Sequence, residues 1–383
     1  MLKVQDLVLK NKKVLVRLDL NVPVQNKMVM DDFRIVQSMA TIKHLLEQQA
    51  QVIIMSHLGR PQPEEHDAEQ PEFSLEVLIP KLTELLGLPV LLYKSLTEVK
   101  PAVTHVSLLE NVRFNLGETI NCPELGRAYA RLADVFVLDA FACSHREHAS
   151  VFGVLNHIKQ AAVGFLFQQE MALIESVAAD IKAPSVAIVG GSKVSSKLAL
   201  LTSLATKVDK IIVGGGIANT FLLARNHFIG ASLAESELIT AAQAIDRQTE
   251  VIVPTNVVVS DSNLKLANTK HVDAVTASDM IVDIAAFDAE KCAGIIAAAS
   301  TIIWNGPLGI YENPLFAGGT RIIANAVLAS SANKLIGGGD TVAALNSLNI
   351  NIDSKHISTA GGAFLSYLDD GFAELKVILN KFK

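Results

Sequence analysis

Four arginines in the first half of the chain stand at or soon after the ends of predicted strands: Arg60, Arg113, Arg146 and Arg34, which follows the Asp31-Asp32 turn. Parallel sheets bind ligands at the carboxyl ends of their strands, so these side chains would share one edge. A guanidinium group is a planar fork that binds carboxylate and phosphate oxygens two at a time. For each arginine alone, a solvated or salt-bridged surface position is an equal alternative. Their common placement favours a pocket for a small, multiply charged anion.

Three histidines near these arginines raise a metal or acid–base alternative. His145 and His148 belong to the run HREH, which lacks the HExxH spacing of a helical zinc site and has no third ligand nearby. We expect hydrogen bonding from these two. His57, close to Arg60, is the better candidate for an anion contact. Arg17 lies inside a predicted strand and is expected to be structural.

The second half of the chain offers backbone groups in place of guanidinium groups. Its predicted strands run into glycine-containing turns at 190–191, 214–216, 305–307, 337–339 and 361–362. Such turns let backbone N–H groups approach phosphates, and a helix that starts there adds a favourable dipole. The clearest instance is GGGDT at 337–341, in which Asp340 could hold Mg²⁺ and Thr341 begins a helix over 341–348.

Two lysines follow the first glycine pair in the segment GGSKVSSK at 190–197. The segment does not match the Walker A pattern GxxxxGK[ST]. Lys193 and Lys197 are four residues apart, which on a helix would turn both ammonium groups toward one phosphate chain. No GxGxxG fingerprint with a correctly spaced acidic residue is present, and this argues against a dinucleotide dehydrogenase.

The elements that must position these groups alternate between strand and helix. Strands are predicted in the first half at 14–18, 52–55, 106–109 and 135–138. In the second half they are predicted at 186–189, 211–213, 251–253, 301–304, 335–336 and 356–358. This alternation predicts parallel sheets with helices on both faces.

The first of the intervening helices is strongly amphipathic. It carries Ile35, Met39, Ile42 and Leu45–Leu46 on one face, and Asp31 or Asp32 is placed to cap it. Because the two halves offer different ligand chemistry, we expect two domains with two ligand sites. Their boundary is predicted between 164 and 184, with a helical connector over 168–180.

Composition limits the function further. The 383 residues are 50% hydrophobic and 19% charged, with a net charge of −6, which is typical of a globular protein and does not favour nucleic acid as a partner. We find no signal peptide and no apolar run long enough to cross a membrane. Cys122, Cys143 and Cys292 form no CxxC pair, so a reducing cytoplasm is the simplest expected setting.

Taken in order, the motifs resemble those of the phosphoglycerate kinase family nearly end to end. The matching segments are VRLDLNVPV (16–24), DDFRI (31–35), SHLGRP (56–61), LLENVRF (108–114), DAFACSHREHAS (139–150), GGSKVSSK (190–197), GGGIANTFL (214–222), WNGPLGIYE (304–312), GGGDTVAA (337–344) and STAGGA (358–363). The resemblance implies reversible Mg²⁺-dependent phosphoryl transfer between 1,3-bisphosphoglycerate and ADP, giving 3-phosphoglycerate and ATP. It also suggests a monomer, although the sequence itself leaves the oligomeric state open.

The same resemblance implies an α/β fold of two Rossmann-like domains, each a parallel sheet with helices on both faces, joined by a hinge helix. Residues 1–167 would bind 3-phosphoglycerate and residues 168–371 the nucleotide, while 372–383 would pack back on the first domain. The implied substrate ligands are Asp19, Asn21, Arg34, His57, Arg60, Arg113 and Arg146. The implied nucleotide ligands are Lys197, Asn305, Glu312, Gly338, Gly339, Asp340 and Thr341, with Asp340 on the metal. The implied catalytic groups are Arg34, Lys193, Lys197, Gly338 and Gly339.

The chain departs from the family pattern at a few places: Leu138, Ala142, Asn256, Ala285–Ala286 and Ala360. These changes keep open a second hypothesis, a catalytically silent relative that binds without turnover. They leave the arginines and lysines in place, and we therefore expect an active enzyme.

Overall fold

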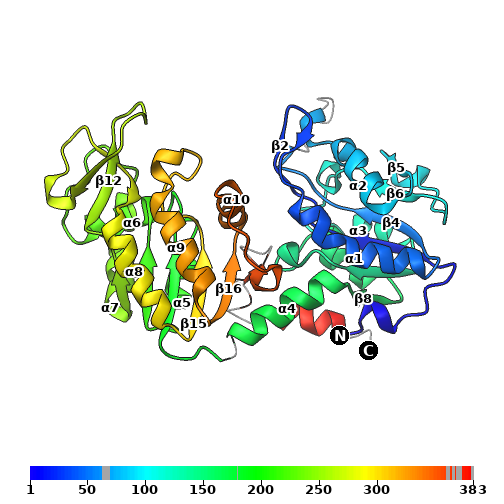
Figure 1. Cartoon of the computed structure of the whole chain (residues 1–383). Helices are drawn as coiled ribbons and strands as arrows, with labels where there is room; N and C mark the ends of the chain where they lie inside the picture. The colour runs from blue at the N-terminus through cyan, green and yellow to red at the C-terminus, as the bar shows by residue number, and fades with distance from the viewer. Residues whose placement is uncertain (63–69, 179, 359–362, 365–366, 368–372, 381–383) are drawn as a thin grey trace. The chain divides into compact units, whose positions relative to one another are not determined.

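The computed structural model describes residues 1–62, 70–178, 180–358, 363–364, 367 and 373–380. It divides into two compact units, Met1–Ala172 with Asp370–Lys383, and Leu173–Asp369. Each unit holds a six-stranded parallel sheet (Figure 1). The predicted α/β fold is confirmed. Among the described residues, no helix is both long and apolar enough to cross a bilayer.

The sheet of the first unit has the strand order β5-β6-β4-β1-β7-β8. Its strands are β1 (Lys13–Arg17), β4 (Gln51–Met55), β5 (Val90–Tyr93), β6 (Val106–Leu109), β7 (Val135–Leu138) and β8 (Ala161–Val163). The chain adds strands on one side of β1 and then crosses to the other side with β7. This reversal leaves a crevice at the carboxyl ends of β1 and β7, where open α/β sheets bind their ligands.

Both faces of this sheet are covered. Val14 and Val16 pack in a core cluster with α1 (Phe33–Glu47) and α2 (Ile79–Leu86). Leu15 lies between them in β1, so it faces the opposite side, and it is also fully buried.

The apolar face predicted for the first helix is confirmed, with Ile35, Met39, Ile42 and Leu45 buried in α1. Its cap differs from the simplest expectation. Asp32 occupies the N-cap position, but its side chain caps no backbone N–H and pairs with Lys81 at 2.9 Å. Asp31 instead accepts a hydrogen bond from the backbone N–H of Phe33 at 2.8 Å.

The sheet of the second unit repeats this plan with the order β11-β10-β9-β15-β16-β17. Its strands are β9 (Ser185–Val189), β10 (Lys210–Val213), β11 (Glu250–Ile252), β15 (Thr301–Asn305), β16 (Asn333–Gly337) and β17 (Ile357–Ser358). Its helices are α5 (Leu198–Ala205), α6 (Gly215–Ala224), α7 (Ile239–Gln248), α8 (Ala286–Ala298), α9 (Gly318–Ala329) and α10 (Gly339–Ser347). The reversal of strand order lies between β9 and β15, which places a second ligand crevice there.

Several strands were not predicted. β5 and β8 are short edge strands of the first sheet. β2 (Val24–Gln25) and β3 (Met28–Val29) are strands of two residues each that pair as an antiparallel hairpin. A separate antiparallel sheet contains β12 (Asn256–Ser260), β13 (Asn268–His271) and β14 (Met280–Ile284). The residues of β13 read NTKH and are largely exposed, so no apolar alternation marks them as a strand.

The predicted connector is helix α4 (Phe165–Ala178), which runs from the first unit into the second (Figure 1). Its first turn is held by Asp139, which follows β7 and accepts a hydrogen bond from the N–H of Phe167 at 2.9 Å. Burial raises the pKa of the Asp139 carboxyl to about 7. Near the other end of the chain, α12 (Ala373–Asn380) belongs to the first unit and buries Leu375 and Leu379.

Two departures from the family pattern, Ala285 and Asn256, fit their surroundings. Ala285 is the N-cap of α8 with a φ of −70°, a value that alanine adopts freely, so no glycine is required there. Ala360 lies outside the described residues. Asn256 donates its side-chain amide to Asp288 at 3.0 Å, while the N–H groups of Thr255 and Asn256 donate to the same carboxylate at 2.7 and 2.8 Å.

We predict that Asn256→Asp, which restores the usual family residue, destabilises this chain by about 1–3 kcal/mol. The change removes the amide donor and sets a second carboxylate against Asp288, which is 6% exposed. Urea unfolding of the purified variants measures the effect. Asn256→Asp combined with Asp288→Asn should recover part of the loss, because a donor again faces a carboxylate. An unchanged unfolding midpoint in the single variant would contradict the explanation.

Candidate active site

The residues that follow β1, β4, β6 and β7 come together at one edge of the first sheet. Arg34 in α1 reaches Asp19, with 2.5 Å between Nη1 and Oδ2. Asn21 accepts a hydrogen bond from the N–H of Gly59 at 2.8 Å, and Arg113 donates to the carbonyl oxygen of the same glycine. The predicted substrate residues of three separate motifs are thus linked through a few short contacts.

The charges of neighbouring arginines also affect the pKa of Arg113. Burial, together with the charges of Arg146, Arg17 and Arg60, lowers the pKa of Arg113. Like charges depress one another's pKa only when they are close, so these guanidinium groups share one region. Arg60 is exposed, while Arg34, Arg113 and Arg146 are half-buried. A group of cations held this close favours a multiply charged anion as its ligand.

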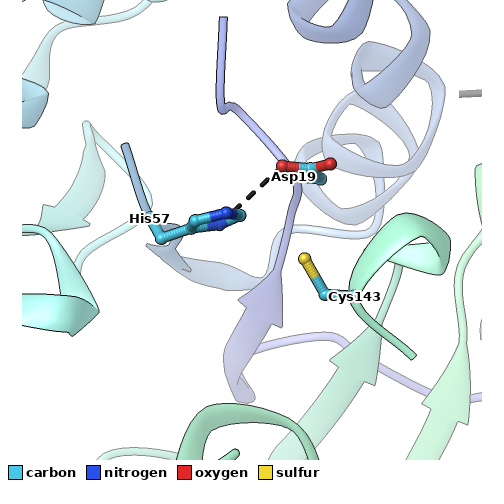
Figure 2. A group of neighbouring side chains, drawn as sticks. All are labelled: Asp19, His57 and Cys143. Carbon is cyan, nitrogen blue, oxygen red and sulfur yellow. Dashed lines mark ion pairs between the residues drawn. The ribbon is translucent and has the colours of Figure 1, made fainter. Parts of the chain in front are cut away.

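Asp19, His57 and Cys143 form a buried cluster at this edge, and Figure 2 shows their side chains turned toward one another. One potential ligand atom from each residue lies within 4.8 Å of the other two, as a soft divalent cation would require. The surrounding charges oppose such a cation. Arg34 is paired with Asp19, and Arg17 donates to Cys143 at 3.9 Å. The cluster therefore belongs to the cationic edge of this sheet.

The electrostatics of this cluster keep Asp19 charged and Cys143 neutral. Burial by itself raises the pKa of the Asp19 carboxyl, but the guanidinium of Arg34, followed by His57 and Arg17, brings it below its usual value. Burial, followed by the neighbouring charge of Asp19, raises the pKa of the Cys143 thiol. Asp19 therefore serves as a fixed anion that orients Arg34, and Cys143 as a small neutral neighbour.

Arg17 and Cys143 were not predicted for this site. The prediction that Arg17 is structural is incomplete, because its guanidinium group reaches His57 at 3.3 Å. The signal was present in the spacing. Arg17 and Asp19 are two residues apart, and residues i and i+2 of an extended strand lie on one side.

In the second unit, a pocket of about 370 Å³ opens at the carboxyl edge of the sheet. Glycine backbone from the two predicted turns Gly191 and Gly215–Gly216 lines part of it, and Leu233, Met280 and Ile310 supply apolar side chains. A pocket of this size with one apolar wall and one polar wall suits a nucleotide-sized ligand. The apolar wall was not predicted, because Met280 lies in the antiparallel sheet that the sequence pattern did not reveal.

Glycines at the strand reversal allow two loops to cross closely. A Cβ on Gly190 would collide with the carbonyl oxygen of Pro307, and a Cβ on Gly306 would collide with that of Gly190. Gly338 is the N-cap of α10 with a φ of 95°, in the region that favours glycine. The N-terminus of α10 can therefore begin directly beside the crevice, two residues before the predicted start at Thr341.

Lys197 lies at the same place. Its Nζ is bonded to the side-chain oxygen of Asn305 and lies 3.3 Å from the carbonyl oxygen of that residue. Burial lowers the pKa of Lys197 to about 8, against the attraction of Asp340. The predicted helical spacing of the two lysines is wrong. Residues 193–197 precede α5 as irregular chain, Lys197 is the N-cap, and Lys193 is exposed.

The remaining predicted nucleotide residues occupy two kinds of position. Glu312 and Asp340 are exposed and line the pocket. Thr341 is fully buried, where its hydroxyl donates to the carbonyl oxygen of Gly337 and accepts from the N–H of Gly306, both at 2.7 Å. The Thr341 side chain thus holds two loops together from behind the pocket.

A family model described as Phosphoglycerate kinase matches residues 4–371. The chain belongs to the phosphoglycerate kinase family. It is 45% identical to the phosphoglycerate kinase of Psychrobacter sp. (strain PRwf-1) over 379 residues and 44% identical to that of Coxiella burnetii over 369 residues, covering 94% of each chain.

Solved structures agree with this assignment. The phosphoglycerate kinase structure from Coxiella burnetii aligns with a TM-score of 0.83 at 42% identity, covering 99% of both chains. That from Pyrococcus horikoshii OT3 aligns with a TM-score of 0.87 at 27% identity, covering both chains completely. The chain is thus an ATP-dependent kinase that catalyses reversible phosphoryl transfer between 1,3-bisphosphoglycerate and ADP in glycolysis and gluconeogenesis, with hinge-bending domain closure.

Proposed function

We propose that the cationic edge of the first unit binds 3-phosphoglycerate and 1,3-bisphosphoglycerate, and that the pocket of the second unit binds ADP and ATP. The proposed ligands of the acidic substrate are Asp19, Asn21, Arg34, His57, Arg60, Arg113 and Arg146. The observation that supports this most directly is that burial, followed by the charges of Arg146, Arg17 and Arg60, lowers the pKa of Arg113. Such a cluster is electrostatically strained until an anion with several charges joins it.

The reaction needs no general base. A carboxylate has a pKa of about 4 and is already ionised at neutral pH, so 3-phosphoglycerate can attack the terminal phosphoryl group of ATP directly. Catalysis must then come from positioning and from charge on the transferring oxygens. We assign that charge to Arg34, Lys193, Lys197 and the N–H groups at the start of α10, Gly338 and Gly339.

Magnesium enters with the nucleotide, and we propose Asp340 as its protein ligand. Asp340 is an exposed carboxylate in the first turn of α10, and it takes part in no ion pair within the described part of the chain. Magnesium commonly takes one or two carboxylates, with waters and phosphate oxygens filling the other positions, so this residue fits the ion. When bound, the ion neutralises charge on the phosphates.

The other nucleotide residues divide by position. Lys197 and Asn305 lie at the strand reversal and are assigned to the phosphates. Glu312 lines the pocket together with the apolar side chains and is assigned to the ribose. Thr341 supports the loops that carry the backbone donors. Since each site is built within one chain and the three cysteines are unpaired, we also propose a cytoplasmic monomer.

The test is an assay of ATP-dependent phosphorylation of 3-phosphoglycerate by the purified protein, with the product trapped by a coupling enzyme. Turnover is expected with Mg²⁺ and is expected to disappear when the ion is chelated. Asp340→Asn should raise the Mg²⁺ concentration needed for half-maximal rate. Tight binding of both substrates without turnover would instead support the silent-relative hypothesis.

A further inference from the structure

Each nitrogen of the Arg17 guanidinium group contacts a polar atom inside the protein. Its side chain is 1% exposed. Its Nε donates to the hydroxyl of Ser150 at 2.9 Å, its Nη1 donates to the carbonyl oxygen of Leu18, and its Nη2 lies 3.3 Å from Nδ1 of His57. A buried guanidinium this fully bonded is fixed in both position and direction.

The charge of Arg17 is balanced from behind by a buried carboxylate. Glu118 is 1% exposed, and it accepts hydrogen bonds from the hydroxyl and the N–H of Ser150 at 2.6 and 3.1 Å. Ser150 therefore stands between Glu118 and Arg17, donating to one and accepting from the other. This chain of bonds leaves Nη2 pointing at His57.

Nδ1 of His57 has one neighbour that donates hydrogen bonds and one that accepts them. Arg17 can only donate, at 3.3 Å, whereas Asp19 can only accept, at 3.8 Å. Oδ2 of Asp19 is bonded to Arg34 at 2.5 Å, and Oδ1, which faces His57, already accepts from the N–H of Asn21 at 3.3 Å. The distance of 3.8 Å to Nδ1 is too long for a hydrogen bond. The geometry therefore makes Nδ1 the acceptor, and the ring proton must sit on Nε2.

We propose that Arg17 is a positioning residue that holds His57 as the neutral tautomer with its proton on Nε2, so that the ring offers one N–H donor to the acidic substrate. The proposal rests on the proposed function for the contact with 3-phosphoglycerate. The proposed tautomer of His57 is a property of the ligand-free protein, so that part of the proposal does not depend on the proposed function.

Burial and the surrounding arginines also favour a neutral His57. Burial lowers the pKa of the ring well below its usual value; the charge of Asp19 opposes this, while the charges of Arg17, Arg113 and Arg146 reinforce it. The anion site thus receives its positive charge from arginines alone. His57 contributes a directed donor whose state does not change between about pH 6 and 8.

The tautomer can be read in the wild-type protein by long-range ¹H–¹⁵N correlation after labelling with ¹⁵N-histidine. We expect His57 to show a protonated Nε2 and an unprotonated Nδ1 from about pH 6 to 8. A proton on Nδ1, or an imidazolium in this range, would overturn the proposal. Titration with 3-phosphoglycerate should shift the Nε2 resonance, and the absence of a shift would overturn the substrate contact even where the tautomer is as proposed.

Arg17→Lys tests the role of the guanidinium while keeping a charge opposite Glu118. One ammonium group cannot reach both Ser150 and His57, so we expect Nδ1 of His57 to lose its donor and to carry the ring proton in part of the molecules. The KM for 3-phosphoglycerate should rise about tenfold, with the KM for ATP unchanged. Arg131→Lys, at an exposed position of the same unit, is the matched control. A wild-type tautomer in Arg17→Lys would remove Arg17 from this role.

The orientation of the donor can be tested on His57 itself. A glutamine amide reaches about as far as Nε2, whereas an asparagine amide reaches only about as far as Nδ1. His57→Gln should therefore keep a KM for 3-phosphoglycerate within a few-fold of wild type, and His57→Asn should raise it by about tenfold or more. Equal effects of the two substitutions would contradict a directed Nε2 donor.

Discussion

Arg34→Ala is expected to lower kcat by about 10²–10³-fold while leaving the affinity for ADP nearly unchanged. The guanidinium lies at the cationic edge of the first unit, held there by its ion pair with Asp19. We assign it to the transferring phosphoryl group, whose charge is redistributed in the transition state. Removing a preorganised charge of this kind raises the barrier more than it weakens ground-state binding.

A loss of stability could imitate this result. Asp19 is buried, and without Arg34 its carboxylate would keep only weaker partners, at a cost of several kcal/mol. The double variant Arg34→Ala with Asp19→Asn removes the stranded charge, so it should recover stability without recovering turnover. Steady-state kinetics and calorimetric titration of ADP separate the two effects. A parallel fall in kcat and in ADP affinity would remove Arg34 from the proposed catalytic role.

The anion site was largely visible in the sequence because its residues follow strands in contiguous motifs. Arg113, for example, stands four residues after the end of β6, and the alternation of strands and helices is enough to place it at the ligand edge. Arg17 was missed because its spacing from Asp19 shows only which side of the strand it lies on, and not which groups its guanidinium contacts. That direction depends on Ser150 and Glu118, which are more than a hundred residues away.

The second site was less visible because much of it is backbone. The glycine runs predicted the turns, but they do not predict which turns pack against each other. The close approach of Gly190 and Pro307 arises only once β9 and β15 are neighbours. The antiparallel sheet that supplies Met280 was missed for a related reason. β13 is polar and exposed, so pairing with β12, and not a hydrophobic pattern, makes it a strand.

Lys197→Met is expected to lower kcat/KM for ATP by about 10²-fold or more, and wild-type kcat/KM should itself fall as pH rises through about 8. Burial lowers the pKa of Lys197 to about 8 in the free protein. The ammonium form therefore predominates below that pH and attracts phosphate, and the neutral form above it does not. The profile should be flat on the acid side and fall tenfold per pH unit on the alkaline side.

The variants assign this alkaline limb to one residue. Lys197→Met should be slow at every pH and show no limb, since it has no group to titrate. Lys197→Arg keeps its charge to above pH 12, so whatever activity it retains should not fall near pH 8. Lys207→Arg, at an exposed position beyond α5, should keep the wild-type profile.

The bound nucleotide adds a further expectation. Phosphate oxygens beside Nζ favour the ammonium form, so the limb in kcat should lie at higher pH than the limb in kcat/KM, which reports the free protein. A limb near pH 8 that persists in Lys197→Arg would show that another group titrates. Lys197 would then be a buried lysine whose charge is not needed for phosphate binding.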